Sequence, residues 1–595
     1  MPPRRPLKRR GEDDDRSPAR QNKKVGKNKR EQTYDTYDEA LDGGVEMEEK
    51  GERYRDGDKS QRFYEKAIEL YAKAFGYQET YDAAYNQARA LYTLSTSFLL
   101  PPASLPHLRK SIEMYKLATS LTNSPLLRMD VGFNLSQSCS ALADVLEDLD
   151  SEASREEVRK LREEARDVLQ DVMDGQEAYL NATGEENDEA EAEEVVEEVE
   201  GGAEADSMQV DPDPLSGEDD EEEGDAAGDG DKSATFETHL PTPSTFIDTV
   251  LSLLDLHLSL WESTSTPRTP TEEEQTAVRA ILDRAAPLAP PGRQAELDLA
   301  EIKVLLTMDS IVWDLFKLEA KVGMGLERSL EGAIAALGAV LASLDVTPPE
   351  EQTVRPDILT TLADTHMATA RRMMFLNAQL PAGPSPLAQQ AWFHLSQAIT
   401  HLSAALDLPT SALTPREFKP SVLLSLSKAS LARARLAPIH ETAQRNVVQL
   451  LDNATTYAAR AGEGLGWKFM RIDGTAPTAS TGLSLSIGGG AGINSGGDGL
   501  PWPAGWEAEA LGRIIAFQQI RVCLFASKTD LLSEEARARY TTGLGIVIGK
   551  LKGLGASNGD RKIGSKDLER FLGEIEDDEG GVLEVEKAWW AEILA

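Results

Sequence analysis

Apolar side chains recur every three or four residues through most of the chain, which is the spacing that lines one face of an α-helix. Ala67, Tyr71 and Ala74 are spaced i, i+4 and i+7 and therefore share a helical face. The same spacing returns 44 residues later at Tyr115 and Ala118. Alanine and leucine are abundant and runs of β-branched residues are few, so the pattern predicts helices rather than strands.

The helical spacing also returns in the second half of the chain. It is clearest at Ala398, Leu402 and Ala405, which precede Pro409, and the first helix of that pair is expected over 359–375. Because proline cannot continue a helix, Pro409 marks the end of the unit. Further amphipathic segments predict helices over 133–139, 165–172, 333–340, 423–436, 447–461, 507–525 and 531–552.

Small and aromatic residues alternate at the positions where the two helices of a hairpin would touch. Gly51 and Tyr54 stand before a turn at 57–58, and Tyr85 and Ala88 open the following first helix. Small side chains let two helices approach closely, and an aromatic ring fills the space between them. These residues therefore predict a series of packed helical hairpins.

The hairpin pattern resembles the tetratricopeptide repeat (TPR) family, in its Gly, Tyr, Ala, aromatic and Ala positions. The resemblance implies an all-α, TPR-like α-solenoid. The unit of 44 residues is longer than the TPR period of about 34 residues, and few units carry the full set of marker residues. A HEAT-like solenoid and a plain helical bundle are the alternatives.

Three segments have compositions that cannot form a packed core. Residues 1–35 contain twelve Lys or Arg, and residues 185–231 contain 23 acidic residues and no Lys or Arg. Residues 474–506 are rich in Gly and Ser. These segments divide the chain into a disordered basic arm (1–35), N-terminal TPR-like repeats (36–180), a disordered acidic tract (181–240), a second TPR-like region (241–465), a Gly/Ser-rich linker (466–505) and a C-terminal helical cap (506–595).

The net charge of −39 bears on the choice of ligand. Binding to nucleic-acid phosphates needs an excess of Lys and Arg, so nucleic acid is not expected as the main ligand. An acidic surface attracts basic proteins and is repelled by anionic membranes. The chain also lacks an apolar run of about 18 residues and an apolar segment after its basic start, so neither a membrane span nor a signal peptide is expected.

Two basic clusters in the N-terminal arm, 8–10 and 23–30, resemble a bipartite nuclear localisation signal. Nuclear localisation is therefore expected. The alternative is a solvated basic arm that contacts RNA or an acidic partner.

The sequence contains no recognisable catalytic constellation. Cys139 and Cys523 are far apart and are expected to pack as small apolar side chains. His394 and His401 share a helical face, but no third ligand stands near them in sequence, so no metal site is expected. Gly490-x-Gly492 lacks the surrounding strand and helix of a dinucleotide loop. We therefore expect a non-enzymatic protein without a cofactor.

Two sets of residues are candidates for partner binding or its regulation. Arg89, Arg109, Lys110 and Lys116 fall on neighbouring predicted helices and are a candidate clamp for a peptide carboxylate. The alternative is that they lie on solvated helix faces. Ser216, followed by Gly-Glu-Asp, is a candidate site for an acidophilic kinase.

The combination of a basic arm, a helical-repeat body and an acidic tract resembles the NASP-like histone chaperones. It is also similar in layout to ribosomal-protein escorts with TPR bodies and to fungal nuclear TPR-like regulators of translation termination. The resemblance implies a nuclear escort or chaperone for a basic client such as a histone or ribosomal protein. The alternatives are a general scaffold whose acidic loop is passive, and a regulator of an enzyme.

Overall fold

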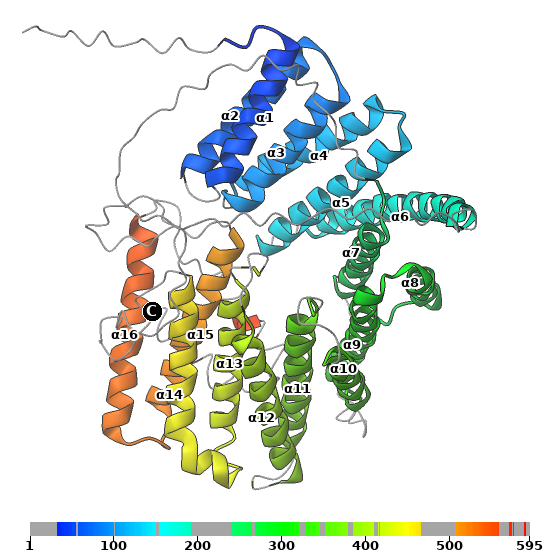
Figure 1. Cartoon of the computed structure of the whole chain (residues 1–595). Helices are drawn as coiled ribbons and strands as arrows, with labels where there is room; N and C mark the ends of the chain where they lie inside the picture. Colours follow the sequence, from blue (N-terminus) through cyan, green and yellow to red (C-terminus); the bar gives the residue numbers. More distant parts are fainter. Residues whose placement is uncertain are drawn as a thin grey trace, which may run out of the picture.

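The chain is all-α in the part that a computed structural model describes, with no strand in these residues (Figure 1). The described residues are 33–54, 58–99, 101–149, 154–191, 240–263, 268–319, 329–345, 352–378, 383, 385–409, 414–415, 417–465, 506–557, 571–573, 575, 588 and 590. Nearly all of the basic arm, most of the acidic tract, the Gly/Ser-rich linker, Ser216 and Trp589 lie outside them.

The first six helices form three hairpins, each packed most closely within itself. They are α1 (Tyr37–Tyr54), α2 (Asp58–Tyr77), α3 (Tyr81–Ser97), α4 (Ser104–Leu121), α5 (Pro125–Asp148) and α6 (Arg155–Glu191). The sequence-based boundary at 180 falls inside α6, because this helix continues through Glu191. The acidic tract thus begins as helix, which agrees with the good intrinsic helix propensity of Glu and Ala.

The remaining helices form a less regular middle section, which is followed by three regular hairpins. The middle contains α7 (Pro243–Glu262), α8 (Glu272–Ala285), the 3₁₀ turns η1 (Ala286–Leu288) and η2 (Pro291–Arg293), α9 (Gln294–Glu319) and α10 (Glu331–Leu344). The hairpins follow as α11 (Arg355–Ala378) with α12 (Pro386–Asp407), α13 (Phe418–Arg435) with α14 (Glu441–Gly464), and α15 (Trp506–Lys528) with α16 (Glu534–Ser557).

Side-chain caps fix where several helices begin. Thr242 and Thr271 form capping boxes at the starts of α7 and α8, and the Ser385 hydroxyl accepts the Ala388 backbone N–H at the start of α12. Each cap satisfies a backbone donor that has no partner within its helix. His440 does the same for α14, because its Nδ1 atom accepts the Ala443 backbone N–H.

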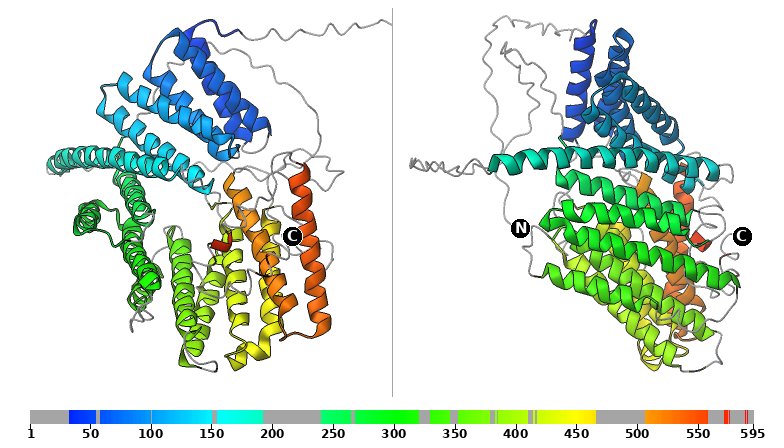
Figure 2. Two further views of the ribbon diagram at one scale, coloured as in Figure 1. Left: turned by 180° about the vertical axis from the view of Figure 1, so that it is seen from behind. Right: turned by 90° about the vertical axis from the view of Figure 1, so that its right-hand side faces the viewer.

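The hydrophobic core is a series of clusters along the chain. One joins α1 to α3, the next runs from α3 to α9, a small one joins α9 to α11, and the last runs from α11 to α16. Figure 2 shows the same order as colours that follow one another through the stack. Helix α6 packs directly on α7, so packing continues across the acidic tract. A core in which each element contacts its neighbours is typical of an α-solenoid, and the predicted fold class is confirmed.

Most of the residues predicted to pack between helices are buried. The alanines and large side chains with at most 1% exposure are Ala67, Tyr71, Ala74, Ala88, Tyr115, Ala118, Ala398, Leu402 and Ala405. Gly51 is also buried and Tyr85 is partly buried. Tyr54 differs, because it is 44% exposed and stacks on Phe63 at 5.5 Å near the turn between α1 and α2.

The glycines of α1 allow tyrosine rings to lie directly on its backbone. A Cβ atom at Gly44 would stand 2.4 Å from Tyr71 Cε1, and one at Gly51 would stand 2.8 Å from Tyr64 Cε2. Tyr71 is fully buried, and its hydroxyl donates a hydrogen bond of 2.7 Å to Glu48. The glycine at position 51 is therefore explained by the close approach of an aromatic ring.

The substitution Gly44→Ala tests this packing. We expect it to lower the free energy of unfolding by about 1–3 kcal/mol, because the Tyr71 ring has no room to move away. Gly338→Ala in α10 is the matched control, since a Cβ there meets no atom within 4 Å. The control should raise the free energy of unfolding by about 0.5–1 kcal/mol through helix propensity alone. Urea unfolding of both variants would measure the difference, and equal effects would contradict it.

The C-terminal end of the chain docks on the last hairpins. Trp590 is 2% exposed and lies edge-on to Phe571, with ring centroids 6.0 Å apart. Trp590 thus belongs to the hydrophobic cluster that runs from α11 to α16. None of the helices in the described ranges is long and apolar enough to cross a membrane.

Candidate functional site

The four cations of the candidate clamp each form an ion pair within the chain. Arg89 binds Glu48 of α1 at 3.0 Å, and Lys110 pairs with Glu113 of its own helix at 3.2 Å. The other two pair with α6, Arg109 with Glu157 at 2.9 Å and Lys116 with Glu164 at 2.5 Å. The structure thus turns Arg89 toward α1 and two of the others toward α6. It gives the peptide-clamp prediction no support.

The histidines of the second half are closer together than the sequence suggested. His366 of α11 places its Nδ1 atom 2.9 Å from Nδ1 of His394, and its ring stacks parallel to His401 at 5.6 Å. His366 stands 28 residues before His394, so it was not among the residues near these two histidines in sequence. In the described part of the chain, no group of three or more His, Cys, Asp or Glu has the geometry to hold a metal ion.

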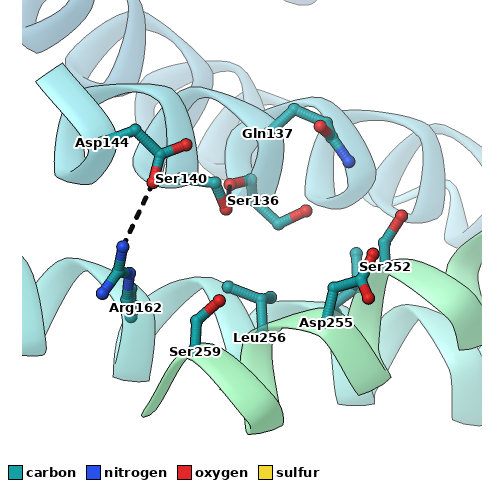
Figure 3. A pocket seen from close by; sticks show the side chains of 10 residues that line it. Ser136, Gln137, Ser140, Asp144, Arg162, Ser252, Asp255, Leu256 and Ser259 are labelled. Atoms are coloured by element: carbon teal, nitrogen blue, oxygen red, sulfur yellow. Dashed lines mark hydrogen bonds and ion pairs between the residues drawn. The ribbon is translucent and has the colours of Figure 1, made fainter. Parts of the chain in front are cut away.

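A polar cavity lies where α7 packs against the α5–α6 hairpin. We call it the α5–α7 pocket. It has a volume of about 190 Å³ and is lined by Ser136, Gln137, Ser140, Asp144, Arg162, Leu169, Ser252, Asp255, Leu256 and Ser259. Figure 3 shows the α5 side chains facing those of α6 and α7 across this cavity.

Arg162 is the only cation among the lining residues, and its charge is already compensated. Its side chain is 8% exposed, and Nη2 donates to Glu147 at 2.6 Å and to Asp144 at 3.2 Å. Nη1 donates to the second oxygen of Glu147 at 3.2 Å. This bidentate pair with two carboxylates ties α6 to α5. It leaves little of the Arg162 charge for a ligand.

The carboxylates around the pocket remain partly exposed to solvent, although protein atoms nearby desolvate them. Asp144 keeps 54% of its side chain exposed, yet desolvation raises its pKa against the lowering effect of Arg162. Desolvation also raises the pKa of Asp255, which Lys303 opposes. Glu262, near the C-terminal end of α7, has a raised pKa through desolvation, with a further contribution from Glu147. Carboxylates in such a concave setting gain from a cationic partner.

The side chains that line the pocket can bind a cationic group. Asp144, Asp255 and the serine hydroxyls offer oxygen acceptors, while Arg162 is engaged by carboxylates. The ten lining residues include no histidine, cysteine or lysine that would pair with a nucleophile. A Lys or Arg side chain from a protein partner fits both the charge and the small volume.

Sequence reasoning did not single out the pocket, although its spacing was visible. Ser136, Ser140 and Asp144 are spaced i, i+4 and i+8 on α5, while Ser252, Asp255 and Ser259 share one face of α7. In a chain with 101 carboxylates, an Asp at helical spacing carries no information by itself. Only the packing of α7 on α5 and α6 brings the two faces together.

Comparisons with known proteins leave the family open. No protein-family model matches the chain, and no curated protein matches it either. A solved circular tandem repeat protein is 13% identical, covers 90% of this chain and 96% of its own, and has a TM-score of 0.24. The S. pombe nuclear import adaptor Nro1 is 13% identical over 63% of this chain and 97% of its own, with a TM-score of 0.26. TM-scores this low carry no argument.

The helix packing itself defines the class of protein. The chain is an all-α protein built from stacked helical hairpins around a serial hydrophobic core. Membership of the TPR family in particular stays a prediction.

Proposed function

We propose that this chain is a non-enzymatic protein-binding scaffold that recognises a basic segment of a protein partner. The carrying observation is the α5–α7 pocket, in which carboxylates with raised pKa values surround a single arginine that is already paired. A cationic side chain placed there would favour the ionised forms of Asp144 and Asp255, against the desolvation that raises their pKa values. Helical-repeat proteins commonly offer such extended surfaces to partner segments.

The finer form of the proposal is a nuclear escort for a basic client such as a histone or a ribosomal protein. The basic clusters at 8–10 and 23–30 support nuclear import, and the 23 carboxylates of 185–231 support loose shielding of a basic client. The alternative is a scaffold that uses the pocket alone and in which the acidic tract is passive. Phosphorylation at Ser216 would strengthen the escort form by adding negative charge.

Affinity capture from a nuclear extract tests the pocket. Full-length chain and the Asp255→Lys variant are used as baits at low and moderate salt, and captured proteins are identified by mass spectrometry. We expect the recovery of basic proteins by Asp255→Lys to fall at least about tenfold, because the new cation repels a basic segment. Asp171→Lys is the matched control, since Asp171 is an exposed residue of α6 outside the pocket lining.

The outcomes separate the two forms of the proposal. Loss of a basic client with Asp255→Lys but not with Asp171→Lys supports recognition at the pocket, whereas equal capture by both variants contradicts it. A third bait without 185–231 then tests the tract. A client lost on that deletion supports the escort, and a client retained supports the scaffold with a passive loop.

A further inference from the structure

Arg433, near the C-terminal end of α13, packs against the aromatic ring of Trp392. Its guanidinium carbon is 3.8 Å from the ring centroid of Trp392 on α12. The Trp392 ring also stacks on His440, the N-cap of α14, at 4.7 Å and an interplanar angle of 12°. Three successive helices therefore hold the guanidinium in place through a flat aromatic surface.

Arg433 forms no ion pair with any described residue, although the chain has a net charge of −39. Within the described ranges, no Asp or Glu lies at ion-pair distance from it, and its Nε–H is buried without an acceptor. Desolvation lowers the pKa of its guanidinium, and no carboxylate is among the causes. Arginines whose pKa is instead raised by nearby carboxylates are Arg89, Arg162, Arg268, Arg284, Arg293 and Arg539.

The exposed edge of Arg433 determines what it can bind. Nε is the only one of its three nitrogens that is buried without an acceptor, and the residue as a whole is partly exposed. No hydrogen bond or ion pair with another described residue engages its two terminal nitrogens, so a ligand that reaches them meets two unpaired donors. Two parallel N–H donors match the two oxygens of a carboxylate. A phosphate dianion is favoured less, because a single cation would have to hold two charges in a chain of net charge −39.

We propose that Arg433, held against Trp392, is a binding site for a carboxylate of a protein partner, supplied by an acidic side chain or by a C-terminus. The site lies on α12, α13 and α14, and the α5–α7 pocket lies on α5, α6 and α7. The proposal therefore stands independently of the proposed function. A partner that places a carboxylate here would compensate a desolvated charge that the described residues leave uncompensated.

The first test uses the unaltered full-length chain. Phenylglyoxal modifies accessible arginines, and peptide mass spectrometry reads the rate at Arg433. The probes are pools of randomised, N-acetylated hexapeptides: amidated without Asp or Glu, amidated with Glu, and free at the C-terminus without Asp or Glu. We expect the carboxylate-bearing pools to slow modification of Arg433 and the first pool to leave it unchanged. The pool that protects best identifies a side-chain or a C-terminal source.

The second test measures binding of the same pools, carrying a fluorescent label, by anisotropy. We expect Arg433→Gln to weaken binding at least about tenfold, because a charge-assisted pair of hydrogen bonds is lost. Arg433→Lys should recover only part, since lysine keeps the charge but not the planar fork. Arg445→Gln on α14 is the control, because Arg445 has a side-chain exposure of 67%.

Clear results would overturn the proposal. Equal protection by all pools, or stronger protection by inorganic phosphate at the same ionic strength, contradicts a carboxylate site. Equal weakening by Arg433→Gln and Arg445→Gln indicates only a loss of net charge. If Arg433→Gln fails to fold by circular dichroism, the protection of the unaltered chain still decides the outcome.

Discussion

Replacing Asp309 by alanine is expected to lower the free energy of unfolding by about 3–5 kcal/mol, because it leaves a buried arginine without its counter-charge. Asp309 of α9 and Arg372 of α11 form an ion pair of 2.5 Å with side chains that are 15% and 6% exposed. The pair joins α9 to α11, the same two helices that the smallest of the hydrophobic clusters connects. Its loss should therefore loosen the chain between its two larger cores.

The remaining contacts of Arg372 cannot replace the carboxylate. Its Nη1 atom donates to the Ser329 hydroxyl at 2.9 Å, and its guanidinium carbon lies 4.9 Å from the Trp313 ring centroid. A neutral hydroxyl and an aromatic face compensate a buried charge only in part. The contact with Asp309 is close in distance but is not a well-directed hydrogen bond, so charge compensation is its main contribution.

Two controls show whether the effect comes from the unpaired charge. The double variant Asp309→Leu with Arg372→Met removes both charges and keeps apolar volume, so it should regain most of the lost stability. Asp345→Ala breaks the exposed pair with Arg355, where Asp345 is 63% exposed, and should cost at most about 1 kcal/mol. Urea unfolding measures all three. A double variant no more stable than Asp309→Ala would show that packing, not charge, sets the cost.

The regular hairpins could be predicted from the sequence because their signal is local. Ala398, Leu402 and Ala405 lie on one face of α12, and the same spacing that revealed them also buries them. The helices α7 to α9 were missed because they carry no such alanine positions and do not pair as regular hairpins. Their place is decided by contacts with α6 and with one another, which no short window of sequence contains.

The candidate site was harder to predict, since its contacts are distant in sequence. The residues next to Arg89 in the sequence do not reveal its partner. In the structure Arg89 binds Glu48, which lies 41 residues earlier on another helix. His366 stands 28 residues before His394, and only the α11–α12 hairpin brings the two rings into contact. Helical periodicity says which residues share a face, but it does not say which faces meet.

The histidine cluster predicts a loss of stability in mild acid. Burial lowers the pKa of His366 from 6.5 to about 4, with repulsion from His394 and His401 adding to it. The two Nδ1 atoms of His366 and His394 lie 2.9 Å apart, so one must donate and the other accept. If both rings were protonated, both Nδ1 atoms would carry a hydrogen and this hydrogen bond would be lost. Glu331 of α10 raises the pKa of His394 but does not overcome the desolvation that lowers it.

The sign of the pH dependence follows from these directions. The unfolded chain takes up a proton at His366 near pH 6.5, and the folded chain does so only near pH 4. Stability from this residue is therefore complete above the unfolded pKa and is lost as the pH falls toward the folded value. The full loss amounts to about 3 kcal/mol, of which about 2 kcal/mol is reached by about pH 5. Carboxyl groups with raised pKa values, such as Asp255 and Glu262, act in the opposite direction.

A variant separates the histidine from the carboxyl groups. His366→Gln keeps a polar side chain of similar size that does not titrate, while Asp255 and Glu262 stay in place. The free energy of unfolding, measured by urea at neutral pH and at about pH 5, should fall by about 2 kcal/mol more in the original chain than in the variant. The variant can be less stable at neutral pH without affecting this comparison, because only the pH-dependent difference carries the titration of His366. An equal fall in both proteins would mean that His366 takes up its proton with the same pKa in the folded and unfolded chains. Since burial is the main cause of the lowered pKa, such a result would also contradict the packing of α11 on α12 at this point.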